Sequence, residues 1–104
     1  MTLPLRISEE ADAEMVEAAR WYERHRAHLG VEFLDAVNAA MTSTTETPGL
    51  GSPVPGIGDL TIRRRPVRRF PYHVVYLELP DRLQILAIAH DRRRPAYWMG
   101  RLSS

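Results

Sequence analysis

Two strand-like runs in the second half of the chain constrain its fold more than any other feature. Residues 72–79 and 83–89 are rich in apolar side chains, and the short turn Pro80-Asp81-Arg82 joins them. This pattern is typical of an antiparallel hairpin. The run 83–89 is apolar on both faces, which indicates an interior strand that is covered on both sides. A helical layer can cover one side, and a partner chain is a candidate cover for part of the other.

Arginines crowd the outer ends of this hairpin. They are Arg63, Arg64, Arg65, Arg68 and Arg69 before it, and Arg92, Arg93 and Arg94 after it. Antiparallel pairing brings the outer ends of two strands together, so we expect one edge of the sheet to carry these guanidiniums. His90, Tyr97 and Trp98 are expected beside them.

The two halves of the chain differ in charge. Residues 1–50 carry four arginines against nine acidic residues, a net charge of −5, whereas residues 51–104 carry ten against four, a net charge of +6. A basic face of this kind suggests an anionic partner. The chain has no lysine, and a bias in composition explains the abundance of arginine equally well.

The first half predicts a short strand and two helices. Residues 3–7 alternate as a strand does, and Ser8 is a good N-cap for a helix from Glu9 to about Leu29. Gly30 is expected to end that helix, and a second helix covers about 31–44. The short connection makes the pair an antiparallel helical hairpin. The expected inward residues of the first helix are Ala11, Met15, Val16, Ala18, Ala19, Tyr22 and Leu29, and those largely outside are Glu9, Glu10, Glu14, Glu17 and Arg24.

The remaining segments complete one α+β domain in two layers. Residues 47–59, rich in proline and glycine, predict a loop. Residues 60–65 predict a strand that Pro66 ends or interrupts, which suggests an edge or a bulge. Residues 95–102 predict a short C-terminal helix with Pro95 in its first turn, and the last two serines are expected to fray.

The composition excludes several classes of protein. The 104 residues, 44% of them hydrophobic, suit a single domain over 1–104. Without cysteine the chain can hold neither disulfides nor a thiolate zinc site, which fits a reducing cytoplasm. No apolar run is long enough to cross a membrane, and the N-terminus lacks the features of a signal peptide. His25 and His28 are three residues apart with no third ligand nearby, so neither a metal nor another cofactor is expected.

The order of elements and several short motifs resemble the RelE/ParE toxins of type II toxin–antitoxin systems. The motifs are Ala19-Arg20-Trp21-Tyr22, Leu29-Gly30, Phe33-Leu34, Pro48 with Gly51-Ser52-Pro53, and the segments 68–76 and 85–93. The resemblance implies a four-stranded sheet of order 1-4-3-2, which places 83–89 centrally. It also implies a toxin that a protein antitoxin neutralises, in a possible toxin–antitoxin hetero-oligomer.

The family's targets divide in two, and the residues of this chain match both groups in part. RelE-like members cut mRNA on the ribosome, whereas ParE-like members poison DNA gyrase without being enzymes. Arg63 with Arg65, and Arg93 with Tyr97, match the spacing of RelE-like site residues. His73 occupies a place where those enzymes carry arginine, and Asp91 stands where a further arginine is expected. His90 directly after the last strand resembles ParE-like chains.

A metal-independent ribonuclease needs a base, an acid and cations around the phosphate. The candidate catalytic residues are His73, His90, Arg93 and Tyr97, and those for binding RNA or another target are Arg63, Arg65, Arg68, Arg69, Arg92 and Trp98. Each has a structural alternative: a basic surface that only docks an antitoxin, a hydrogen-bonded corner for His90, an exposed surface position for His73, and a packing anchor for Trp98. Three classes remain open: a ribosome-dependent ribonuclease, a gyrase poison, and a decayed member that only binds its antitoxin. The spacing of Arg93 and Tyr97 slightly favours the first of them.

Overall fold

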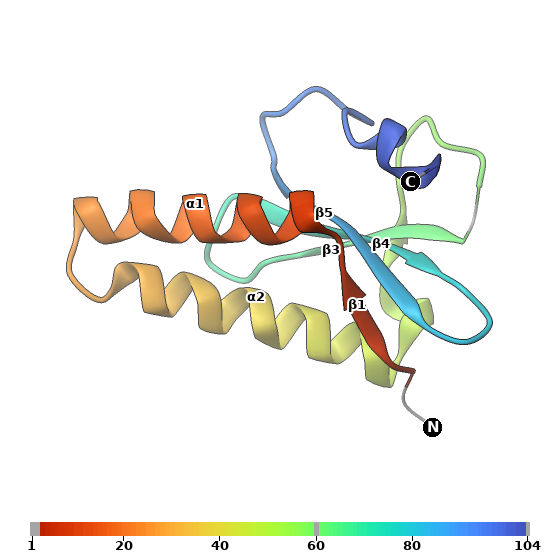
Figure 1. Cartoon of the computed structure of the whole chain (residues 1–104), viewed down its shortest axis with the longest axis horizontal. Helices are drawn as coiled ribbons and strands as arrows, with labels where there is room; N and C mark the ends of the chain where they lie inside the picture. The colour runs from red at the N-terminus through yellow and green to blue at the C-terminus, as the bar shows by residue number, and fades with distance from the viewer. Residues whose placement is uncertain (1–2, 60, 104) are drawn as a thin grey trace.

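The computed structural model describes residues 3–59 and 61–103, in which two helices cover one face of a five-stranded sheet (Figure 1). In chain order the elements are β1 (Leu5–Ile7), α1 (Glu9–His25), α2 (Leu29–Glu46), the 3-10 turn η1 (Pro48–Leu50), β2 (Ser52–Pro53), β3 (Ile62–Pro66), β4 (Tyr72–Glu78), β5 (Leu83–His90) and the 3-10 turn η2 (Met99–Ser103). Within this part of the chain, no helix is both long and apolar enough to cross a membrane.

The strand order β1-β5-β4-β3-β2 contains the predicted order and adds one strand. β1 runs parallel to β5, and the other neighbours are antiparallel. The expectation of four strands is therefore wrong by one. β2 lies in the predicted loop, where two residues, Ser52 and Pro53, pair with Arg64 and Arg63. So short a strand, with a proline in it, leaves almost no periodic signal in the sequence. The predicted start of β3 at Leu60 lies outside the described residues.

β5 is an interior strand, as its apolar pattern predicts, because it lies between β1 and β4. The register between β4 and β5 shifts at a bulge, since Val75 pairs with Ala87 but Tyr76 pairs with Ile85. As a result, Leu86 and Ala87 both face the side of the sheet away from the helices. Leu83, Ile85 and Ile88 face the helices instead. The sheet thus has two cores, one on each side of β5.

The first core lies between the sheet and the helical hairpin. α1 contributes Ala11, Ala18 and Ala19, and α2 contributes Phe33, Val37 and Met41. Ser8 caps α1 as predicted, since its hydroxyl accepts a hydrogen bond from the backbone N–H of Ala11 at 3.1 Å. The prediction is wrong for two residues of the expected inward stripe of α1. Val16 is exposed, and Leu29 belongs to α2.

The corner between the helices differs from the prediction. α1 ends at His25, and Gly30 lies inside the first turn of α2. The residue with positive φ is His28, at 73°. The Glu23 carboxylate accepts hydrogen bonds from the backbone N–H groups of His28 and Gly30, which lowers the pKa of Glu23. A glycine is needed at position 30 for close packing, because a Cβ there lies 2.6 Å from the carbonyl oxygen of Ala19.

Gly30→Ala is expected to destabilise the fold by roughly 1–2 kcal/mol. Alanine favours a helix over glycine by about 0.5–1 kcal/mol, but overpacking against a backbone atom that cannot turn away costs about 1–3 kcal/mol. Chemical denaturation measures the difference. Gly49→Ala, where a Cβ meets no atom within 4 Å, is the control. A stabilised Gly30→Ala variant contradicts the close helix contact.

The C-terminal segment covers the second face of the sheet. Residues 95–98 form turns and η2, a 3-10 helix, follows, so the predicted short C-terminal helix is present but begins four residues later than expected. Ala96 has a φ of 63°, a conformation that no α-helix contains. The second core consists of Val54, Ile62, Val75, Leu86, Ala87, Ala89 and Trp98, with Tyr97 and Leu102 packed against it. The chain itself, rather than a partner, therefore covers this face. Ser103 belongs to η2, and Ser104 lies outside the described residues.

Candidate functional site

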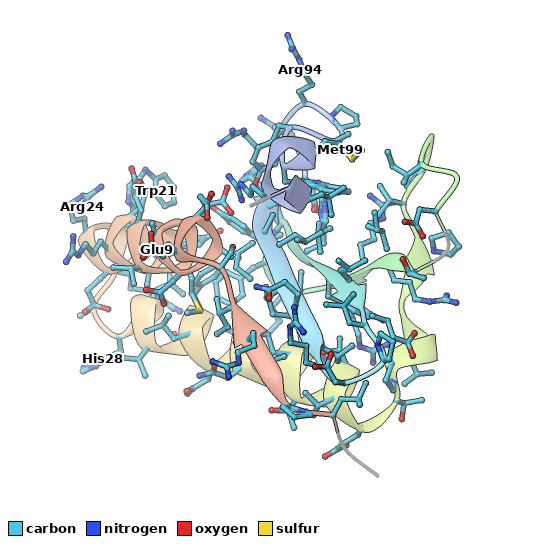
Figure 2. The ribbon with its side chains drawn as sticks, turned by 45° about the vertical axis from the view of Figure 1, so that its right-hand side comes forward. Glu9, Trp21, Arg24, His28, Arg94 and Met99 are labelled. Atoms are coloured by element: carbon cyan, nitrogen blue, oxygen red, sulfur yellow. The ribbon has the colours of Figure 1, made fainter. Side chains whose placement is uncertain are left out.

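The outer ends of the hairpin meet, as the sequence predicts. Tyr72 pairs with His90, and the backbone N–H of Asp91 donates to the carbonyl of Pro71 at 2.9 Å. Residues 91–98, which we call the C-terminal turn, follow directly. At its tip Arg94 points away from the body of the protein (Figure 2).

The predicted arginines do not form a single patch. Successive residues of a strand face opposite sides of a sheet, and β3 carries Arg63, Arg64 and Arg65 in succession. Arg65 faces α2 and lies near Arg68 and Arg69, whereas Arg64 lies on the second face beside His73. The guanidinium of Arg63 is engaged, because Nη1 donates to the carbonyl of Gly51 at 3.0 Å. Only Arg92, Arg93 and Arg94 belong to the C-terminal turn.

Two hollows meet at the C-terminal turn. A groove of about 560 Å³, which we call the α1 groove, lies between α1 and the turn. A notch of about 130 Å³ lies under the turn on the second face. His90, Arg93 and Tyr97 line both, and His73 and Trp98 line the notch. The structure therefore brings together all four candidate catalytic residues. Ligand sites commonly occupy about 300–1,000 Å³, so only the groove has room for a large group.

The two histidines make different contacts. His73 Nδ1 lies 2.9 Å from a carboxylate oxygen of Asp91, and its side chain is mostly buried. It is therefore not the simple surface residue that one interpretation expected. His90 Nδ1 accepts a hydrogen bond from the backbone N–H of Arg92 at 3.0 Å, which agrees with the interpretation of a corner residue. The His90 ring also packs edge-on against Tyr72, with centroids 4.9 Å apart.

Glu14 connects α1 to the C-terminal segment. It accepts hydrogen bonds from the Tyr97 hydroxyl at 2.6 Å, from Arg101 at 2.9 and 3.2 Å, and from the backbone N–H of Ile88 at 3.1 Å. We call this cluster, Glu14 with Tyr97, Arg101 and Ile88, the Glu14 clasp. Burial, first of all, and the hydrogen bond to Glu14 raise the pKa of Tyr97 above its ordinary value.

Sequence reasoning placed Glu14 among the residues outside the buried stripe. It lies three positions after Ala11 and four before Ala18, so it shares their side of the helix. That spacing is the signal that could have identified it. Arg101 was missed as well, because nothing local distinguishes it from the other arginines.

The rings near the turn have limited access. Trp98 is only 2% exposed, so its ring is unable to stack on a base. It is a packing anchor, which was the structural alternative to a binding role. The Arg93 guanidinium lies over the Tyr97 ring, 3.9 Å from its centroid, and covers that face. By contrast, Trp21 on α1 is 48% exposed at the rim of the α1 groove (Figure 2). It stacks on His25 and was expected to pack between helix and sheet.

The described residues contain no group of three or more His, Asp or Glu side chains placed to hold a metal ion. Of the pair noted in the sequence, His25 contacts the backbone through its ring, and His28 contacts Glu23 through its backbone. His25 Nδ1 lies 2.8 Å from the carbonyl oxygen of Trp21, and the backbone N–H of His28 binds Glu23.

Comparison with known proteins identifies the family. The model of the ParE toxin of type II toxin–antitoxin systems, parDE, matches residues 5–95. Among solved structures, the chromosomal ParDE TA system from P. aeruginosa is similar in fold, with a TM-score of 0.72 and 14% identity over 86% of this chain and 96% of that one. The YoeB dimer from Staphylococcus aureus gives a TM-score of 0.58 and 12% identity over 85% and 95%. A search among curated proteins gives no match. The family match covers most of the chain and agrees with the resemblance of its motifs, and the chain is therefore a member of the ParE toxin family of type II toxin–antitoxin systems.

Proposed function

We propose that this toxin arrests growth by binding DNA gyrase, in the manner of ParE-like members, and that a protein antitoxin neutralises it. The sequence slightly favours mRNA cleavage through the spacing of Arg93 and Tyr97, but the contact of the Tyr97 hydroxyl with Glu14 argues against a proton-transfer role for that hydroxyl. The observation that carries this proposal is the Glu14 clasp. Tyr97, the candidate for proton transfer, donates its hydroxyl to Glu14 at 2.6 Å and has a raised pKa.

The surroundings of the α1 groove suit binding better than proton transfer. A general acid or base works best with a pKa near the operating pH, and Tyr97 is moved away from it. The groove instead offers an exposed indole, Trp21, on one side and a guanidinium, Arg93, on the other. Tryptophan and arginine are the residues that most often dominate the energy of protein–protein contacts.

One observation favours a second candidate, RNA cleavage. Asp91 orients His73 through Nδ1, which is how a carboxylate holds a histidine base in catalytic triads. Arg64 lines the same hollow of about 430 Å³ on the second face. A phosphate bound to Arg64 would lie near the His73 ring. The candidate acids His90 and Tyr97 line the neighbouring notch rather than this hollow, and the Tyr97 hydroxyl is engaged with Glu14.

A pair of assays separates the two mechanisms. The purified toxin is expected to block supercoiling by gyrase in vitro, and its expression is expected to induce a DNA-damage response. Primer extension on translated messages is expected to show no codon-linked cuts. Cuts that disappear in His73→Ala, with gyrase unaffected, would replace the proposal with the ribonuclease.

A further inference from the structure

An aromatic ring holds the side chain of Arg93 in place. The guanidinium carbon of Arg93 lies 3.9 Å from the centroid of the Tyr97 ring, and both residues line the α1 groove and the notch. In the part of the chain that the structure describes, the guanidiniums of Arg92 and Arg94 lie over no ring. The stacked position therefore distinguishes Arg93 from the other arginines of the C-terminal turn.

The backbone of the C-terminal turn brings the ring to the arginine. Ala96 has a left-handed conformation with a φ of 63°, and the backbone N–H of Tyr97 donates to the carbonyl of Arg94 at 3.3 Å. The chain reverses within a few residues, so the side chain of Tyr97 returns to that of Arg93. The contact is thus a property of this tight turn and not of a regular helix.

The Tyr97 ring is itself fixed by its surroundings. Its apolar surface packs against the second core, and its hydroxyl donates to Glu14 at 2.6 Å. The guanidinium of Arg101, which also binds Glu14, lies 5.1 Å from the ring centroid. Tyr97 therefore presents a fixed platform to the exposed side chain of Arg93.

The platform orders the arginine without using its hydrogen-bond donors. A carboxylate partner takes up N–H groups at the edge of a guanidinium and neutralises its charge. An aromatic ring instead attracts the cation through the face of its π-system. Among the described residues, no carboxylate lies within ion-pair distance of Arg93. Arg93 therefore keeps its charge and its N–H groups for an external partner while its position is restricted.

We propose that Tyr97 is a positioning residue for target binding, whose ring holds the guanidinium of Arg93 ready for an acceptor on gyrase. The inference rests on the proposed function, because it takes gyrase as the target. Ordering a flexible side chain at an interface lowers affinity by about two- to ten-fold, and a platform that orders it beforehand removes part of this cost. The Tyr97 hydroxyl takes no part in that binding, since it is bonded to Glu14.

Side-chain NMR tests the positioning without any target. The Nε–H signal of Arg93, assigned by its loss in Arg93→Lys, is expected to have an order parameter above about 0.6 in the wild type and in Tyr97→Phe, and below about 0.6 in Tyr97→Leu. Both Tyr97 variants lose the bond to Glu14, but only Tyr97→Leu loses the ring. The comparison therefore isolates the contribution of the ring.

A double-mutant cycle tests the consequence for binding to purified gyrase. Tyr97→Leu is expected to raise the Kd about three- to ten-fold in the wild-type background and less than about two-fold in the Arg93→Ala background. Tyr97→Phe should change the Kd by less than about two-fold, because it keeps the platform. Leu102→Ala is the matched control and should leave the Kd unchanged, since Leu102 packs against the same core but lines neither hollow at the C-terminal turn.

The outcomes separate the inference from the proposed function. If the wild-type toxin binds gyrase but Tyr97→Leu weakens binding equally in both backgrounds, or Leu102→Ala reproduces the loss, Tyr97 is merely structural and the gyrase proposal stands. An order parameter of Arg93 that Tyr97→Leu leaves unchanged also overturns the inference. If the wild-type toxin does not bind gyrase, the proposed function fails, and the same cycle measured as the inducer concentration needed for growth arrest decides whether Tyr97 positions Arg93 for another target.

Discussion

Glu14→Ala is expected to lower the free energy of unfolding by about 3 kcal/mol, the largest effect on stability of any substitution considered. Glu14 and Arg101 are only 18% and 17% exposed in their side chains. Removing one partner of a largely buried ion pair costs about 3–5 kcal/mol, and the partial access of water favours the lower end. The loss corresponds to about 12 °C or more in the melting temperature of a domain of this size. Thermal and urea denaturation measure it.

The controls for this prediction lie on the same helix. Glu17→Ala removes an exposed carboxylate one turn away and should change stability by less than about 0.5 kcal/mol. Glu14→Gln retains an acceptor for Ile88 but lacks the charge for Arg101, so an intermediate loss is expected. If the free energy of unfolding of Glu14→Ala lies within about 1 kcal/mol of the wild-type value, the Glu14 clasp contributes far less than its contacts indicate.

Arg93→Ala is expected to abolish growth arrest and leave the fold intact. Arg93 is exposed and lines both the α1 groove and the notch. Its stacking on Tyr97 is an exposed cation–π contact, which is worth about 0.5–1 kcal/mol to the fold. A charge-assisted hydrogen bond to a target is worth about 1.5–3 kcal/mol, or roughly ten- to 100-fold in binding. Growth after induction, with the melting temperature alongside, measures both effects.

Arg24→Ala is the matched control, because Arg24 projects from α1 far from the C-terminal turn (Figure 2). It should remain fully toxic. Tyr97→Phe keeps the ring under Arg93 and removes only the bond to Glu14, so it is expected to cost about 1 kcal/mol of stability and retain toxicity. The surface is misassigned if Arg93→Ala folds and still arrests growth.

The local signals in the sequence account for the elements that were predicted correctly. Ser8 and the acidic residues after it identify the start of α1, and the apolar run 83–89 identifies the interior strand. These features depend on neighbours a few residues away, so periodicity and capping reveal them. They also define the order of elements through which the family resemblance arises, and the family match agrees with it.

The features that the sequence did not reveal depend on contacts between distant residues. Gly30 has the pattern of a helix end, but its role is to let α2 approach the backbone of Ala19. Glu14 has the composition of a solvated helix surface, yet its partners lie 74 to 87 positions away. Neither contact leaves a periodic trace, because each depends on how whole elements pack.

The arginines show most clearly what the sequence decides and what the tertiary structure decides. The sequence determined that they gather near the ends of one hairpin and give its half of the chain a net charge of +6. Only the tertiary structure decided which face each one serves: Arg64 beside His73, Arg65 and Arg68 along α2, and Arg93 over Tyr97. The physical reason is that alternation along β3 sends neighbouring side chains to opposite faces, while the position of α2 and of the C-terminal turn determines what each face contains.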